Sequence, residues 1–297
     1  MGGFLFSNDH YSLQVIREAD LSQCEEISVI ALLTDGGVAV GDSLKHAVHI
    51  YDKSFAHVRS FGKLKKTDEG FETIDAMALG PGGLLYISGH FQNVSIFTVQ
   101  GEFKGVIDTG TAFVRSILPA GDQLILGTPT EPIVRIVKDG KILRGFGEFP
   151  EYYKRYPSGA YISLAADSGA IYCAMPLSYP ILVYDHQGNP IREIGKPDLM
   201  IKPYTTLDQA SRKDFRAISA LQTLALLNDV LVSVQLLPKG DKDRYAWDIF
   251  STSGTLLKAG LRTDFQVVGI QDGYLLLVRS DHPNRLLFGK LGKGDVK

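Results

Sequence analysis

Three of the seven histidines stand at the same point of a unit that recurs along the chain. His46, His90 and His282 each lie in the polar stretch that follows a pair of short apolar segments. Imidazole is a common ligand of divalent metals and a general base near neutral pH. Three of them on one face would suit a metal ion, but solvated loop histidines are also common without one. The sequence leaves both interpretations open.

Charged side chains stand at the start of several apolar segments, where a fully buried strand would not place them. Glu72 and Asp75 follow one aromatic residue, and Arg115 and Arg216 each follow another. One interpretation is a polar opening in which Arg115 and Arg216 bind an anionic group of a ligand. The other is that the arginines pair with Glu72 or Asp75 and close the opening.

An aromatic and basic segment, FPEYYKRYP, covers residues 149–157. Its tyrosines, Tyr152, Tyr153 and Tyr156, stand beside one lysine and one arginine and follow Phe149. Aromatic and cationic residues together are typical of interface anchors and of stacking against peptides or carbohydrates. In the alternative interpretation the tyrosines fold this segment back onto the body of the protein.

The chain carries no nucleophile motif of the GxSxG or HExxH type and no P-loop. Its two cysteines, Cys24 and Cys173, belong to no Cys-x-x-Cys or Cys/His pattern of structural zinc sites. We expect both thiols to be buried and, because they fall in distant units, not to form a disulfide. Whether the protein is an enzyme stays open on this evidence.

These residues are set in a repeat of about 40 to 50 residues, which is the period of a β-propeller blade. Each copy has short apolar strands separated by Gly, Asp or Asn turns, as in HIYDKSFAHVRSFG (49–62) and LVYDHQGNPIREIG (182–195). An aromatic residue is expected to open the innermost strand of five copies: Phe71, Phe113, Tyr161, Phe215 and Phe265. One blade cannot bury both faces of its sheet, so blades must stack into a ring. The sequence predicts an all-β, six-bladed β-propeller forming one domain over residues 1–297.

The ends of the chain are expected to close this ring. The six blades are predicted at residues 25–63, 71–108, 113–147, 161–195, 215–262 and 265–292. The last blade lacks a fourth strand, whereas YSLQVIREA (11–19) has the pattern of a strand without a partner. We expect residues 11–19 to pair with the edge of the last blade, which removes an exposed sheet edge.

Three long segments interrupt the repeat, at residues 147–160, 196–214 and 237–247. The first two join an outer strand to the next inner strand, and the third joins the second and third strands of blade five. In a propeller all three connections emerge on the same face. Loops longer than about 12 residues are commonly lids or binding loops, so this face is the predicted functional face.

The strand and turn pattern resembles that of six-bladed propellers of the NHL and TolB-like groups. The matching pieces are inner strands that end in glycine, as in TDGG (34–37) and QDG (271–273), then IYD or VYD, then a strand that ends in FG or IG. The resemblance covers the whole chain. It implies a protein from groups that bind proteins, RNA, peptides or small ligands and that include a few enzymes. The YWTD repeat of receptor propellers and the signature of calcium-dependent gluconolactonases are absent from the sequence.

The composition and net charge of the chain argue against some kinds of binding partner. The chain of 297 residues is 44% hydrophobic and 22% charged, as in packed globular proteins. A net charge of −2 argues against nonspecific nucleic-acid binding. No apolar run approaches the roughly 18 residues of a membrane span. We expect no nucleic-acid partner, no transmembrane segment, and a soluble chain that is either cytoplasmic or a mature exported domain, periplasmic or on the surface, without its leader.

These observations together predict a noncatalytic binding propeller without a cofactor. It would recognise a protein, peptide or glycan through the face that bears residues 147–160, 196–214 and 237–247. The alternative is a metal-dependent lyase or hydrolase with its site at the mouth of the central channel.

Overall fold

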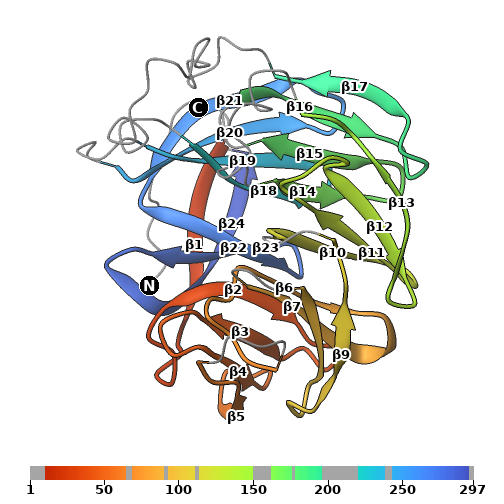
Figure 1. The fold of residues 1–297 in the computed structure, drawn as a ribbon. Coiled ribbons are helices and arrows are strands. Elements are labelled where there is room, and N and C mark those ends of the chain that lie inside the picture. Colours follow the sequence, from red (N-terminus) through yellow and green to blue (C-terminus); the bar gives the residue numbers. More distant parts are fainter. Residues whose placement is uncertain are drawn as a thin grey trace, which may run out of the picture.

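The computed structural model describes residues 11–64, 69–89, 93–110, 114–149, 162–175, 178–195, 220–237 and 243–293. Its strands form six four-stranded antiparallel sheets arranged in a ring, which confirms the predicted six-bladed β-propeller (Figure 1). The first strands of neighbouring sheets contact one another all the way round the ring. They are therefore the inner strands, and they surround the centre of the molecule.

The sheets follow the chain in order. Blade one has β2 (Ile27–Leu32), β3 (Val38–Asp42), β4 (Ala47–Tyr51) and β5 (His57–Phe61). Blade two has β6 (Ala76–Gly80), β7 (Leu84–Ser88), β8 (Val94–Thr98) and β9 (Phe103–Ile107), with a 3-10 turn η1 (Pro81–Gly83). Blade three has β10 (Ser116–Ala120), β11 (Gln123–Gly127), β12 (Val134–Lys138) and β13 (Lys141–Phe146).

The second half of the ring repeats this plan. Blade four has β14 (Ser163–Ala166), β15 (Ile171–Met175), β16 (Ser178–Tyr184) and β17 (Pro190–Ile194). Blade five has β18 (Ala220–Leu227), β19 (Val230–Leu236), β20 (Tyr245–Ser251) and β21 (Leu256–Thr263). Blade six has β22 (Phe265–Gln271), β23 (Tyr274–Arg279), β24 (His282–Lys293) and, from the other end of the chain, β1 (Tyr11–Asp20).

The N-terminal strand closes the ring as predicted. β1 pairs antiparallel with β24, with Tyr11 opposite Lys293 and Asp20 opposite Arg285 (β1 red beside β24 blue, Figure 1). Gly289 lies where β24 is paired on both sides, to Val15 of β1 and Leu275 of β23. Pairing with β1 gives the third strand of blade six a neighbour, so its edge does not face solvent.

The apolar residues pack between blades rather than in one central core. Six clusters of buried residues are found among the described residues, and each draws its members from two neighbouring blades. The middle strands β3 and β4 are buried along their whole length, whereas the outer strand β5 is largely exposed. This distribution is expected where both faces of each sheet are covered by other sheets and only the outer edge meets water.

The opening aromatic residues behave in two ways. Phe265 is the first residue of β22, as predicted, and is buried between blades five and six. Phe71 does not open β6, which begins only at Ala76; it forms a bridge with Leu64 and packs between blades one and two. Phe113, Tyr161 and Phe215 lie outside the described residues. In the part of the chain that the structure describes, no helix has the length and apolar character needed to cross a bilayer.

Candidate functional site at the central cavity

A cavity of about 410 Å³ lies at the centre of the ring and is lined by the six inner strands. Polar side chains line it at or near the beginnings of these strands: Ser28, Asp75, Arg115, Ser116, Ser163, Thr223 and Gln266. Aliphatic side chains line it further along the strands, among them Met77, Ile117, Leu118, Leu164, Leu224, Val267 and Ile270. Because every inner strand occupies the same place in its sheet, all strand beginnings meet at one end of the cavity. That end is called the polar rim below.

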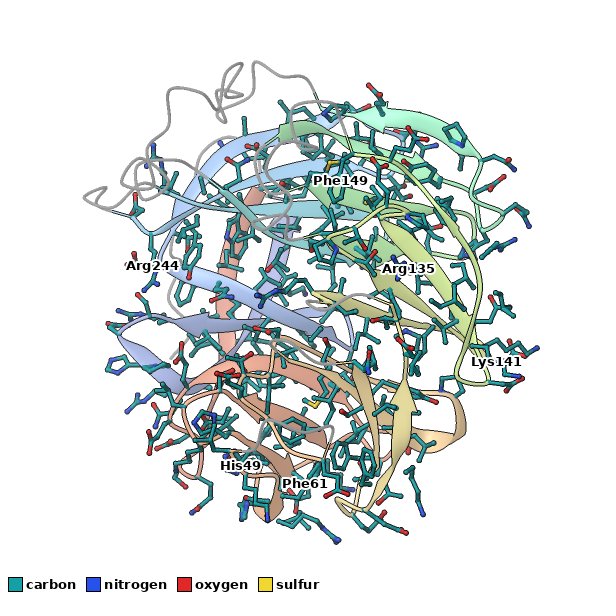
Figure 2. All side chains as sticks on the ribbon, in the orientation of Figure 1. His49, Phe61, Arg135, Lys141, Phe149 and Arg244 are labelled. Atoms are coloured by element: carbon teal, nitrogen blue, oxygen red, sulfur yellow. The ribbon has the colours of Figure 1, made fainter. Side chains whose placement is uncertain are left out.

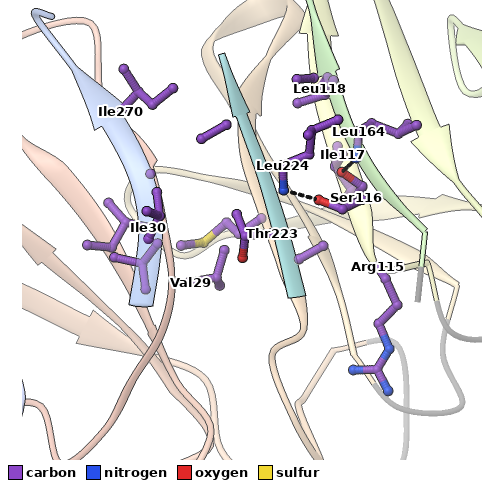
Figure 3. A pocket seen from close by; sticks show the side chains of 18 of the residues that line it. Val29, Ile30, Arg115, Ser116, Ile117, Leu118, Leu164, Thr223, Leu224 and Ile270 are labelled. Atoms are coloured by element: carbon purple, nitrogen blue, oxygen red, sulfur yellow. Dashed lines mark hydrogen bonds between the residues drawn. The ribbon is translucent and has the colours of Figure 1, made fainter. Parts of the chain in front are cut away.

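Figure 3 shows the lining of this cavity from close by. Arg115 lies at one end of the view, and Leu118 and Ile270 lie at the other. The cavity is therefore amphipathic along the axis of the ring.

An ion pair across two blades forms part of the polar rim. Nη1 of Arg115, just before β10, contacts Oδ1 of Asp75, just before β6. The side chains are 17% and 15% exposed, so the pair is only partly in contact with solvent. Thr73 Oγ1 donates a hydrogen bond of 2.9 Å to the other carboxylate oxygen of Asp75. The rim thus presents a guanidinium and a carboxylate side by side.

Two serines of the rim hold neighbouring blades together. Ser116 Oγ accepts a hydrogen bond of 3.2 Å from the backbone N–H of Leu164, and Ser163 Oγ accepts one of 2.8 Å from that of Leu224 (Figure 3). A hydroxyl that accepts one bond keeps its own proton for another acceptor. These serines can therefore support the ring and still donate to a ligand.

The rim also contacts the third long segment. Tyr245, the first residue of β20, donates from its hydroxyl to Gln266 Oε1 over 3.3 Å. Burial raises the pKa of Tyr245, so the hydroxyl stays protonated and remains a donor at neutral pH. Arg244 lies over the Tyr245 ring, with 5.8 Å from its guanidinium carbon to the ring centre (Arg244 labelled in Figure 2). The C-terminal end of segment 237–247 is thus joined to the cavity.

The structure brings together two of the residues predicted at the opening. Arg115 pairs with Asp75. This is the second of the two interpretations given above, in which the arginine pairs with a neighbouring acidic residue. Glu72 is half-buried, and its backbone carbonyl accepts a hydrogen bond of 2.8 Å from Nδ1 of His46. His282 lies at the start of β24, half exposed, with its Nε2 3.9 Å from Oδ2 of Asp281.

Other predicted site residues lie outside the described residues: His90, Arg216, Tyr152, Tyr153 and Tyr156. The three-histidine metal site therefore stays a prediction. Phe149, at the beginning of the aromatic segment, is described and is buried in the cluster between blades three and four. Its backbone N–H donates to Glu131 Oε1 over 2.8 Å, so this aromatic anchors the segment to the body of the propeller (Figure 2).

Sequence reasoning did not select Thr223 or the cluster of Cys24, Asp42 and His49. Thr223 lines the cavity and directly follows a register shift in β18, between Leu221 and Thr223. Such a β-bulge leaves no mark in the strand pattern. The sequence carried one signal for this cluster. Two apolar stretches that are expected to be buried each contain one polar residue, Asp42 in VAVGD and His49 in AVHIY.

Comparisons with known proteins give the fold and not a family. No protein-family model and no curated protein matches the chain. A member of the DUF4221 family from Bacteroides vulgatus ATCC 8482 is similar in structure, with a TM-score of 0.65 and 10% identity over 97% of this chain and 100% of that one. Streptogramin B lyase is similar with a TM-score of 0.56 and 13% identity over 96% and 98% of the two chains.

A protein of unknown function from Bacteroides caccae has a TM-score of 0.55 and 13% identity over 87% of this chain and 92% of that one. At such identities the likeness is one of architecture alone. The NHL or TolB-like type within the six-bladed propellers stays a prediction.

Proposed function

We propose that the protein is a noncatalytic binding propeller that recognises a protein or peptide segment. The binding site would include the polar rim of the central cavity and the predicted functional face that bears residues 147–160, 196–214 and 237–247. The observation that carries the proposal is the amphipathic cavity, which has a polar rim above aliphatic walls. Its volume falls within the range of about 300–1,000 Å³ typical of ligand sites.

The lining favours a peptide over a glycan. Among the described residues that line the cavity, none is aromatic, so no ring face is available there to stack on a sugar. Aliphatic walls suit an aliphatic side chain, whose burial contributes about 1.5–3 kcal/mol. The Arg115–Asp75 pair and the serine hydroxyls of the rim offer both donors and acceptors, as a peptide backbone requires.

A resemblance to the NHL and TolB-like groups supports the same proposal, because those groups include proteins that bind proteins and peptides. The Tyr245–Gln266 hydrogen bond supports it further, since it joins one of the long segments to the cavity rim. A ligand that contacts this segment would then reach the cavity as well.

The alternative is a metal-dependent lyase or hydrolase acting at the mouth of the cavity. The equivalent positions of His46, His90 and His282 in the repeat motivate this alternative, and a protein named streptogramin B lyase has a similar fold. Among the described lining residues, however, Asp75 is the one carboxylate, it is paired with Arg115, and none is histidine or cysteine. A general base or a set of metal ligands would have to come from residues outside this lining. The described lining therefore favours a binding function over a catalytic one.

Selection of displayed peptides tests the proposal. A random peptide library is selected against the wild-type protein and, in parallel, against Thr223→Phe, which fills the cavity beside its rim. We expect peptides with an aliphatic residue between polar ones to be enriched by the wild type only. Equal enrichment by both proteins, or glycan-array binding without any peptide enrichment, would contradict the proposal.

A further inference from the structure

Three polar side chains of blade one are buried together, away from the central cavity. Cys24 precedes β2, Asp42 ends β3 and His49 is in the middle of β4, and they are 3%, 0% and 4% exposed. One ligand atom from each lies within 4.8 Å of the other two. Among the residues that the structure describes, this is the one group of three or more His, Cys, Asp or Glu side chains with such spacing. Figure 2 labels His49 in this blade.

The sheet register explains why these side chains meet. His49 is opposite Val40 on β3, and residues two apart on a strand share a face, so Asp42 and His49 face the same side of the sheet. Cys24 reaches that side from the turn before β2, which is held by its backbone N–H donating to Leu21 O over 2.8 Å. Around them lies the apolar cluster between blades six and one.

The geometry at His49 fits a ligand better than a hydrogen bond. Its Nε2 is buried without a hydrogen-bond partner and lies 3.5 Å from Asp42 Oδ2. An N–H···O bond is usually about 2.7–3.2 Å long. By contrast, two ligand atoms each about 2.0–2.2 Å from a tetrahedral zinc ion stand about 3.4 Å apart. The observed separation is compatible with an ion shared by the two side chains.

The other nitrogen of His49 is already fixed. Its Nδ1 is 2.7 Å from Ser60 Oγ, and that hydroxyl is in turn 2.8 Å from His57 Nε2. Histidines that bind a metal almost always make such a bond with the nitrogen that does not bind it, because it fixes the ring orientation. The arrangement therefore directs Nε2 toward Asp42.

Asp42 places a negative charge in this buried position. Its carboxylate accepts hydrogen bonds from the backbone N–H of Glu25, over 2.6 Å to Oδ2, and from those of Leu44 and Lys45, over 3.0 Å each to Oδ1. The ammonium of Lys45 is partly exposed, donates to Gln23 O over 2.6 Å and lies 3.9 Å from Glu25. A buried anion in an apolar surrounding needs a compensating charge.

We propose that Cys24, Asp42 and His49 form a buried zinc site that ties the turn before β2 to blade one. A thiolate and a carboxylate neutralise the two charges of Zn²⁺, and imidazole adds a neutral nitrogen ligand. Binding converts the Cys24 thiol to the thiolate and releases its proton to solvent. A fourth position remains for a water molecule.

Without an ion, the Cys24 thiol donates a hydrogen bond to Asp42, and Nε2 of His49 stays without a hydrogen-bond partner. Metal analysis of the whole protein distinguishes a zinc site from a polar network that holds no ion. Wild type is purified without chelator from zinc-supplemented cells, beside Cys24→Ser and Cys173→Ser. The last is the matched control, since Cys173 is the other buried free thiol and lies in blade four.

We expect about one zinc ion per chain in wild type and Cys173→Ser, and less than about a tenth of that in Cys24→Ser. Cobalt added to the zinc-free protein should produce a thiolate-to-cobalt charge-transfer band in the first two proteins alone. Zinc should also raise their melting temperature, because an ion that binds only the folded chain stabilises it.

Folded wild-type protein without bound zinc and without the cobalt band would overturn the proposal, and this result needs no variant. Equal zinc in wild type and Cys24→Ser would overturn it too. Because none of the three residues lines the central cavity, neither result depends on peptide binding there.

Discussion

Arg115 and Asp75 form an ion pair between blades two and three at the rim of the central cavity. Each is anchored to its own blade, since the backbone N–H of Arg115 donates to Gly127 O over 3.2 Å and that of Asp75 donates to Ser88 O over 2.8 Å. The pair therefore connects two sheets that share no strand hydrogen bonds. A ligand that enters the cavity from the polar rim would meet this guanidinium and this carboxylate first.

Removing one partner of this pair should destabilise the fold. Arg115→Ala leaves the Asp75 carboxylate without its guanidinium, and we expect the free energy of unfolding to fall by about 1–3 kcal/mol. Urea denaturation followed by fluorescence measures this, because the single tryptophan, Trp247, is fully buried.

A double-mutant cycle and a surface pair provide the controls. Arg115→Ala combined with Asp75→Ala should cost less than the sum of the single changes. Lys104→Ala, which breaks an exposed pair with Glu102, should cost less than about 1 kcal/mol. Strict additivity of the Arg115 and Asp75 changes would show that the ion pair contributes nothing.

Ring closure depends on close packing at Gly289. A Cβ at this position would stand 2.6 Å from Leu277 Cδ1 and 2.8 Å from Leu13 Cδ1, both in fully buried side chains. Gly289→Val should lower the free energy of unfolding by about 1–3 kcal/mol through overpacking. Gly292→Val, on the same strand with no atom near its Cβ, is the matched control and should change it little. Equal effects at both positions would contradict the closure described for β1 and β24.

Asp167 makes part of the stability depend on pH. Burial acts to raise its pKa, but hydrogen bonds from the N–H groups of Gly169 and Ala170 and from the Tyr172 hydroxyl hold it below the usual 3.8. The unfolded chain therefore takes up the proton first as the pH falls. This contribution is complete above about pH 4 and is lost as the pH falls through the lower, folded-state value.

Asp167→Asn should be less stable by about 1 kcal/mol at pH 7, and the difference from wild type should shrink as the pH falls below 4. Denaturation series at several pH values measure it. Asp139→Asn, on an exposed turn, serves as the control. A difference that stays constant down to the lowest pH would argue against a charged role for Asp167.

Much of the fold was predictable because its signals are local. Turn glycines and apolar strands recur at the spacing of a blade, and the unpaired strand at residues 11–19 matched a blade with three strands. The pairing of Arg115 with Asp75 was one of the two interpretations that the sequence allowed. Both residues stand just before an inner strand, so their proximity could be expected but their pairing could not be decided. The Cys24–Asp42–His49 cluster was only partly predictable. The polar residues of VAVGD and AVHIY mark Asp42 and His49 as unusual, but sheet register brings them to Cys24, and a spacing of 18 and 7 residues corresponds to no motif.

The Cys173 thiol should resist modification in the native protein. It is fully buried in β15, and burial raises its pKa to about 12, so little thiolate forms at neutral pH. Native protein treated with iodoacetamide should remain unlabelled at Cys173 by mass spectrometry, and denatured protein should be labelled completely. Labelling of native protein at the rate of a free thiol would contradict the packing of blade four.

Calorimetric titration of an enriched peptide tests the proposed function most directly. The peptide is titrated into wild type, into Thr223→Phe at the cavity, and into Thr255→Phe on the exposed turn between β20 and β21 of the same blade. We predict saturable binding to wild type and Thr255→Phe, with affinity for Thr223→Phe reduced at least tenfold, or about 1.4 kcal/mol. Equal affinity for all three folded proteins would show that the ligand does not occupy the central cavity.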